Sequence, residues 1–212
     1  MMKRTRSWSI SLMAVLALFL LLAGCMGRRY VEKRTFLLDV SRDGTVSTAE
    51  RNVVLRVRTL RVSPRYEGKG FVYRMANFNY ESDFYNEFFT SPDSMITEEV
   101  RQWLAESGLF QQVVDFSSPV NPTHILEGTV MNLYGDFSEG SQPGAVLGIQ
   151  FSLIDDIAGR SEIVLQKSYR REVPIQGMPP AALVEAWNEA LRKVLIDLEK
   201  DLKALDLRTA GS

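Results

Sequence analysis

The chain has 212 residues, with 25 Lys and Arg against 26 Asp and Glu, and a formal net charge of −1 at neutral pH. This balance lacks the clustered basic excess that nucleic-acid-binding proteins carry, so we expect no nucleic-acid partner. The single cysteine excludes an intrachain disulfide framework, and with one histidine in the chain no Cys/His zinc cluster is expected.

The first 25 residues have the pattern of a secretory signal peptide. A short basic start precedes a nearly unbroken apolar run, Ile10 to Leu22, which is short for a membrane span of roughly 20 residues. The closing Leu22-Ala23-Gly24-Cys25 resembles a bacterial lipobox, which in that family is cut before the cysteine once the cysteine is lipidated. We predict a signal peptide over residues 1–24 and lipid attachment at Cys25. The alternative is an ordinary signal peptide with an incidental cysteine.

Removal of residues 1–24 takes away three basic and no acidic side chains. The mature 188 residues then carry 22 basic and 26 acidic side chains, a net charge of −4. A chain of this size buries about 70% of its unfolded surface, so it folds without a disulfide or a metal. We predict a lipidated tether over residues 25–33, one domain over 34–207 and a tail over 208–212.

The first half of the domain predicts strands. Thr35 to Val40 is the first, and Asn52 to Val62 is a longer one that alternates apolar and polar residues and ends at Ser63-Pro64. A third strand is expected over Phe71 to Arg74. Asn79-Tyr80 opens a short fourth.

Residues 66–89 hold nine of the 21 aromatic residues of the chain. One amphipathic strand cannot bury so many rings, and Tyr and Phe at this density beside several Asn are typical of a recognition surface. The alternative is that the rings cap an open end of the core beneath a long loop. The residues that we expect at a partner contact are Tyr66, Phe71, Tyr73, Arg74, Tyr80, Tyr85 and Phe88.

Two helices and a hairpin are expected in the second half. A helix begins at Ser91-Pro92 and ends near Gly108, and a long helix from Pro180 to Leu205 repeats apolar residues at spacings of four and three. The second pattern fits a helix lying on a sheet, with a coiled coil as the alternative. The expected strands between the helices are residues 110–116, 125–134, 145–154 and 162–173, the last two as a hairpin. The fold class is a single α+β domain, a mostly antiparallel sheet with two amphipathic helices packed on it.

Residues that could carry catalysis are sparse. His124 is the one histidine, and a lone histidine is seldom a catalytic base without a nucleophile and an orienting acid. Asp155-Asp156 lacks the alternate-position carboxylates of a calcium loop and reads as a hairpin turn. The sequence has no glycine-rich phosphate loop. We expect a non-enzymatic protein with no catalytic residues, cofactor or metal.

The chain resembles the ABC-type transport auxiliary lipoproteins, the PqiC-like family. The resemblance follows the lipobox and four segments of the mature chain: Val57–Pro64, Gly70–Arg74, Leu104–Val113 and Asn188–Leu198.

The resemblance implies an accessory role beside an MCE-type lipid transporter, which moves lipids between the two membranes of a Gram-negative envelope. The partners would be the membrane, through the lipid on Cys25, and the periplasmic MCE-domain protein, with a homo-oligomer possible. In lipoproteins an Asp after the cysteine tends to retain the protein in the inner membrane, and Met26 stands there instead, which favours the outer membrane. The alternative function is a lipoprotein activator or scaffold of a cell-wall synthase.

Overall fold

The computed structural model describes residues 31–44, 51–76, 78–157 and 161–207. The chain divides into two units, Met1–Glu32 and Lys33–Ser212, and the first contributes only the exposed Val31 and Glu32 to the described residues. The predicted signal peptide, Cys25, most of the tether and the tail lie outside them. No helix within the described ranges is long and apolar enough to cross a membrane.

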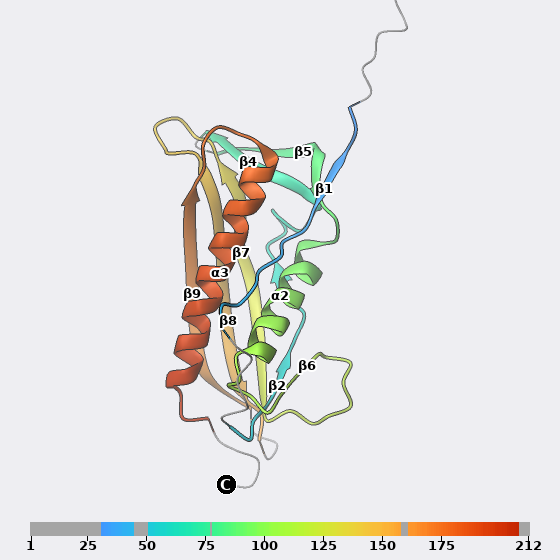
Figure 1. The fold of residues 1–212 in the computed structure, drawn as a ribbon, viewed down its shortest axis with the longest axis vertical. Coiled ribbons are helices and arrows are strands. Elements are labelled where there is room, and N and C mark those ends of the chain that lie inside the picture. Colours follow the sequence, from blue (N-terminus) through green and yellow to red (C-terminus); the bar gives the residue numbers. More distant parts are fainter. Residues whose placement is uncertain (1–30, 45–50, 77, 158–160, 208–212) are drawn as a thin grey trace, which may run out of the picture. The chain divides into compact units, whose positions relative to one another are not determined.

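The described part of the second unit contains nine strands and two helices (Figure 1). In chain order they are β1 (Arg34–Phe36), β2 (Val54–Val57), β3 (Arg61–Val62), β4 (Gly70–Ala76), β5 (Asn79–Phe88), α2 (Pro92–Glu106), β6 (Gln112–Val114), β7 (His124–Asp136), β8 (Gly144–Asp155), β9 (Glu162–Pro174) and α3 (Pro180–Ala204).

The long strand β7 is the centre of the sheet. Along one edge it pairs with β8 in antiparallel fashion, and β8 pairs in the same way with β9. Along its other edge β7 pairs in turn with β2, β3 and β4, each over two or three residues and each parallel. The antiparallel β4–β5 hairpin extends this side, and β1 adds to β5 in parallel. The predicted α+β class is confirmed, with a mixed sheet whose long pairings are antiparallel.

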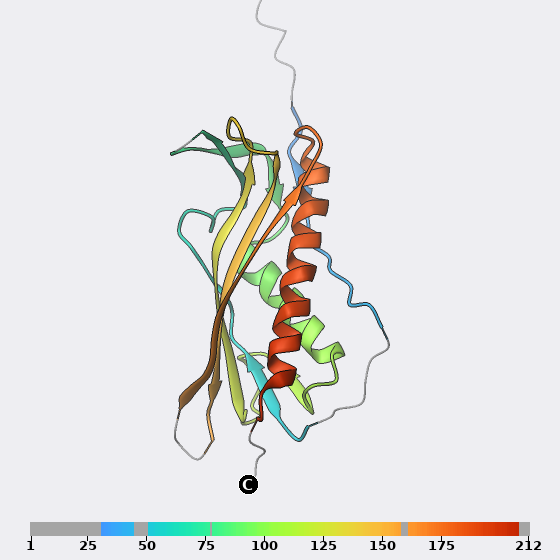
Figure 2. The same cartoon turned by 90° about the vertical axis from the view of Figure 1, so that its left-hand side faces the viewer.

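Both helices cover the same face of the sheet (Figures 1 and 2). α3 packs on β8 and β9, whereas α2 packs on β2, β3 and β6. The predicted apolar stripes are confirmed, because Ile96, Trp103, Trp187 and Leu191 are all buried in one core. The apolar stripe of α3 therefore packs against its own sheet. It is not available for the coiled coil that was the alternative.

The predicted strand Thr35–Val40 is right only at its start. After Phe36 the chain leaves β5 and crosses the two helices, where the Asp39 amide donates to Asn188 Oδ1 at 3.0 Å and the Val40 amide to Glu99 Oε2 at 2.8 Å. Arg42 then forms two hydrogen bonds to Glu199, at 2.8 and 3.0 Å. Helix side chains take the backbone donors that a strand partner would have used, so the segment becomes a strap over α2 and α3.

The predicted strand Asn52–Val62 is two strands. β2 ends at Val57, and β3 does not begin until Arg61. The Leu60 amide donates to Thr97 Oγ1 of α2 at 2.9 Å, and the Leu60 side chain is buried. This contact with the helix replaces a ladder hydrogen bond and interrupts the strand.

Candidate functional site

The rings of the predicted recognition segment divide into two sets. Tyr66, Phe71 and Phe88 are buried, so the prediction that these three contact a partner is wrong. The Phe71 ring lies 4.8 Å from that of Phe88 and 5.1 Å from that of Trp187 on α3. Phe71 and Phe88 therefore close one end of the core beneath α3, and not beneath the long loop that the alternative assumed.

Tyr66 is buried on a different side from Phe71. A bulge in β7 between Val130 and Asn132 shifts the alternation of the strand, so Leu133 joins the core under the helices and Tyr134 turns to the helix-free face. The Tyr66 ring stacks on Tyr134 with centroids 6.0 Å apart. Tyr66 is therefore buried against a side chain of the central strand, with 2% of its surface exposed.

The second set of rings faces solvent because β5 bulges. Gly70 pairs with Glu87 but Val72 pairs with Ser82, so residues 83–86 stand out of the ladder. A side chain at position 70 would not fit beside this bulge, since a Cβ there would lie 2.6 Å from the carbonyl oxygen of Asp83. Phe84 and Tyr85 are exposed on the bulge, with their rings edge to face at 5.3 Å.

The Asp83 carboxylate holds the bulge in place. It accepts hydrogen bonds from the Tyr85 amide at 2.7 Å, the Asn86 amide at 3.0 Å, the Asn86 side chain at 2.7 Å and the Tyr73 hydroxyl at 2.6 Å. Burial would raise the pKa of Asp83, but these hydrogen bonds, that of Tyr73 first, outweigh it and lower the pKa below the ordinary value. Burial, together with the bond to Asp83, raises the pKa of Tyr73, which keeps its hydroxyl a donor. Tyr73 is half-buried, and its hydroxyl bonds to Asp83 within the hairpin and does not face a partner.

The turn of the hairpin presents Phe78, which is fully exposed and has a positive φ of 90°. A bulky residue rarely adopts this backbone conformation, whereas glycine adopts it readily. Phe78 did not stand out among the nine aromatic residues in the sequence, although Asn residues on both sides of it, between two strands, are a turn signal. We call Phe78 and the exposed Tyr80 the hairpin tip.

The base of the hairpin tip is a fixed polar cluster. Arg74 forms two hydrogen bonds to Asp136, of which Nε to Oδ1 measures 2.9 Å, and its guanidinium lies 5.5 Å from the centre of the Tyr134 ring. Burial would raise the pKa of Asp136, but Arg74 and Ser138 outweigh it and hold the pKa low. The Tyr80 ring meets Tyr134 edge to face at 5.7 Å. Arg74 therefore supports the tip, while Tyr80 is available at its surface.

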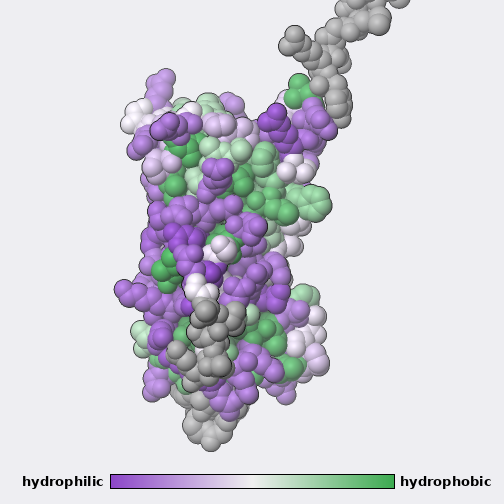
Figure 3. All heavy atoms as spheres, viewed as in Figure 1, coloured by the Kyte–Doolittle hydropathy of each residue, from purple (hydrophilic) through white to green (hydrophobic). Residues whose placement is uncertain are grey.

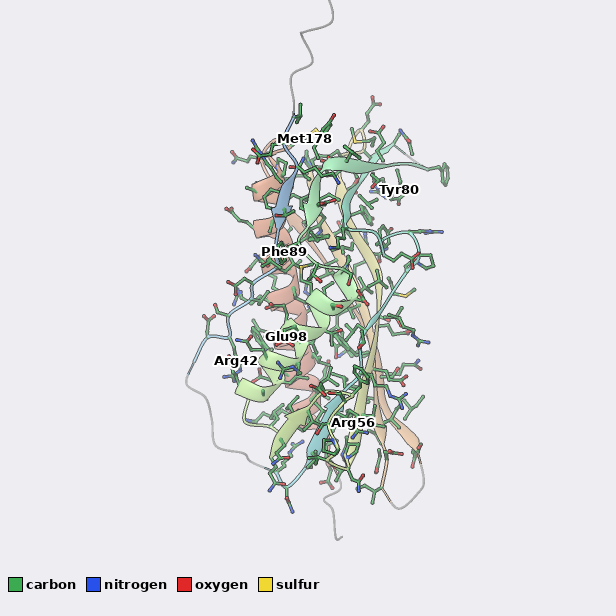
Figure 4. All side chains as sticks on the ribbon, turned by 90° about the vertical axis from the view of Figure 1, so that its right-hand side faces the viewer. Arg42, Arg56, Tyr80, Phe89, Glu98 and Met178 are labelled. Atoms are coloured by element: carbon green, nitrogen blue, oxygen red, sulfur yellow. The ribbon has the colours of Figure 1, made fainter. Side chains whose placement is uncertain are left out.

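Of the seven predicted contact residues, Tyr80 and Tyr85 are exposed, and they lie at different parts of β5. Figure 4 shows Tyr80 and Phe89 at separate positions on the surface. Phe84 meets Tyr85 edge to face, and the exposed Leu37 and Phe89 lie just past the Phe36–Phe88 pair of β1 and β5. None of these three was among the predicted contact residues. The structure thus offers two exposed aromatic surfaces where the sequence suggested one.

His124 and Asp155 are both buried, and they are register partners across β7 and β8. The His124 Nδ1 atom lies 3.1 Å from Thr123 Oγ1. Within the described ranges no three His, Cys, Asp or Glu side chains gather in a way that could hold a metal ion. A groove of about 570 Å³ lies at the strap, lined by residues such as Arg42, Trp103 and Ile196. Glu199 in its wall accepts hydrogen bonds from both Arg42 and Trp103 Nε1, so this carboxylate is bonded within the fold.

Comparison with known proteins gives a fold. No family model matches the chain, and no curated protein matches it. Among solved structures, protein XCC0632 from Xanthomonas campestris, described as family DUF330, is similar with a TM-score of 0.65 and 16% identity over 78% of this chain and 92% of that one. An uncharacterised protein is similar with a TM-score of 0.64 and 16% identity over 81% of this chain and 99% of that one. At these identities the likeness establishes that the chain has the fold of these two proteins.

Proposed function

We propose that the chain is a lipid-anchored, non-enzymatic accessory subunit of an MCE/ABC-type intermembrane lipid transport system. Cys25 carries the lipid and holds the protein at a membrane of the Gram-negative envelope, the outer one, on the periplasmic side. The folded unit docks on the periplasmic MCE-domain protein. This role requires a membrane anchor and a surface that binds the partner protein, and it requires no catalytic group.

The folded unit supports this proposal through the segments that carry the family resemblance. Gly70–Arg74 lies on β4 and Asn188–Leu198 on α3. Val57–Pro64 covers the end of β2 and all of β3, and Leu104–Val113 runs from α2 into β6. Gly70–Arg74, Leu104–Val113 and Asn188–Leu198 are thus a strand, a helix-to-strand passage and a helix, as in the resemblance, whereas the strand expected over Val57–Pro64 is interrupted between β2 and β3. The fold is similar to that of the DUF330 protein XCC0632.

The observation that carries the docking proposal is the hairpin tip. Phe78 is fully exposed in a conformation that costs a non-glycine residue of the order of 1–3 kcal/mol. A rigid ring presented in this way is the type of residue that anchors a protein interface. Figure 2 shows the β4–β5 hairpin projecting from the sheet on the side away from the helices, where a partner can reach it.

The proposal is tested by affinity purification of the mature protein from crosslinked, solubilised membranes. The wild type is expected to recover the MCE-domain protein and its permease. Phe78→Ser should lower that recovery about tenfold or more, because loss of an anchoring ring typically costs at least about 2 kcal/mol of binding. The matched control is Phe116→Ser, since Phe116 is also an exposed phenylalanine but lies between β6 and β7. Recovery of a penicillin-binding protein in place of the transporter would contradict the proposal and support the cell-wall alternative.

The anchor is tested separately. Cys25→Ser should leave the protein soluble or uncleaved, because the lipidated thiol is the predicted attachment point. Mass spectrometry of the mature N-terminus checks this, and cleavage elsewhere with an unmodified Cys25 would contradict the anchor.

A further inference from the structure

β1 and the end of β5 form a two-stranded ribbon with one buried and one exposed row. Their parallel register pairs Arg34 with Asn86 and Phe36 with Phe88. Phe88 belongs to the core, and Phe36 packs against it. The intervening positions face outward, because side chains alternate along a strand. Thr35 and Glu87 form the outward pair of the register, Leu37 and Phe89 follow it, and Lys33 and the bulge residue Tyr85 precede it.

The outward row is rich in exposed apolar surface. Leu37 and Tyr85 are exposed, Phe89 is 63% exposed, and Phe84 on the adjoining bulge is 69% exposed. The Phe89 amide donates to the Phe36 carbonyl at 2.8 Å, which fixes Phe89 beside Leu37. Figure 3 shows apolar residues gathered on this side of the unit, over β1 and the end of β5. We call Lys33, Leu37, Phe84, Tyr85 and Phe89 the β1–β5 patch.

Lys33 completes the patch with a positive charge. Its ammonium lies 4.6 Å from the centre of the Phe84 ring and 3.0 Å from Glu87 Oε2. Aromatic rings with a lysine at their margin are the composition of surfaces that lie at a membrane–water boundary, where the rings enter the headgroup region and the ammonium meets phosphate.

The tether keeps the patch close to the bilayer. Lys33 follows Cys25 by eight residues, which span at most about 29 Å when fully extended. β1, which lies between Lys33 and Leu37, is therefore the first strand of the described unit after the predicted anchor. A weak contact of the patch with lipid is favoured at such a high local concentration.

We propose that the β1–β5 patch lies in the headgroup region of the bilayer that holds the lipid on Cys25, and that this contact sets the orientation of the folded unit. The inference rests on the lipidation of Cys25 in the proposed function and adds a second membrane contact to it. The lipid tail alone would leave the unit free to rotate on its tether. With the patch seated, the hairpin tip, which projects from the helix-free side, stays available to a protein partner (Figure 2).

The test measures the depth of single rings in vesicles. The lipidated protein is reconstituted, at low surface density and without any other protein, in phosphatidylethanolamine–phosphatidylglycerol vesicles that contain acyl-brominated lipid. Phe84→Trp is compared with Phe116→Trp, because both phenylalanines are 69% exposed. The native Trp103 and Trp187 are buried and give the same background in both variants. Bromine should quench Phe84→Trp about twofold or more above Phe116→Trp, since only a ring in the headgroup region approaches the acyl chains.

Phe89→Trp is the second reporter and should be quenched as Phe84→Trp is. Equal quenching of the reporters and of Phe116→Trp in the lipidated protein overturns the inference alone. Quenching that changes with protein surface density assigns the patch to a second copy and also overturns it. A mature chain without lipid on Cys25 overturns both the inference and the proposed anchor, and mass spectrometry identifies that case before the vesicles are prepared. Docking on an MCE-domain protein plays no part in the measurement.

Discussion

Phe71 and Phe84 belong to the same hairpin but have opposite surroundings. Phe71 has no exposed surface and touches three other aromatic rings, whereas Phe84 is 69% exposed and has Lys33 and Tyr85 beside its ring. The inner rings of the hairpin therefore stabilise the fold by packing β4 and β5 against α3. Its outer rings are exposed to solvent and can contact a partner. Substitutions on the two sides should affect different measurements.

The largest expected effect is the loss of an inner ring. Phe71→Ala should lower the free energy of unfolding by about 3–5 kcal/mol, because it removes a buried ring from contact with Phe36, Phe88 and Trp187. Phe84→Ala should change it by less than about 0.5 kcal/mol, since surface substitutions seldom cost more. Urea unfolding of both variants measures the difference. Similar losses in the two variants would show that the outer rings also belong to the core.

The next largest effect is expected at Asp83, the carboxylate that holds the bulge between the buried and the exposed rings. Asp83→Ala should cost about 1–3 kcal/mol, because it leaves the amides of Tyr85 and Asn86 and the hydroxyl of Tyr73 without their acceptor. Glu81→Ala is the matched control, since Glu81 is an exposed carboxylate on the same strand and its hydrogen bond from the Asn79 side chain is long at 3.5 Å. Hydrogen exchange at the Tyr85 and Asn86 amides should accelerate in Asp83→Ala alone. Unchanged exchange would mean that other contacts hold the bulge.

The sequence predicts the elements whose signals are local. The bounds of α2 and α3 differ from expectation by one or two residues, because proline at the start and apolar spacing define both helices. Gly108, at a φ of 70°, lies where a glycine was expected to end the first helix. The β8–β9 hairpin is also where period-two alternation places it.

Elements that depend on distant pairing are less predictable. β5 extends to Phe88, although Asn79 to Phe88 shows no alternation, because Asp83 bulges the strand and β1 pairs with its end. For the same reason the sequence could not tell Phe88 from Phe89. Their directions are set by the pairing of Phe36 with Phe88, a contact between segments separated by β2, β3 and β4.

Removal of one hydroxyl should have a smaller effect than removal of the Asp83 carboxylate. Tyr73→Phe takes away one of the four hydrogen bonds to Asp83 but keeps the ring, which lies edge to face with Phe137 at 5.6 Å. We expect a loss of about 1 kcal/mol in the free energy of unfolding. Tyr85→Phe is the control, because Tyr85 is exposed and bonds to Asp83 through its backbone amide. Equal effects of the two changes would remove Tyr73 from the support of the bulge.

The smallest effect is the acid dependence of the same carboxylate. The hydrogen bonds to Asp83 outweigh the effect of burial and hold its pKa below the ordinary 3.8 in the folded protein. A group with a depressed folded pKa stabilises the fold fully above its unfolded pKa, and this stabilisation is lost as the pH falls through the folded value. Below about pH 4 the wild type should therefore lose stability more steeply than Asp83→Asn, which cannot titrate. Other carboxylates with low pKa values, such as Asp136 and Asp201, titrate in both proteins, so the difference between the two urea-unfolding profiles isolates Asp83. Parallel profiles between pH 6 and pH 3 would show that the charge of Asp83 contributes nothing to the bulge, and that its geometry alone turns Phe84 outward.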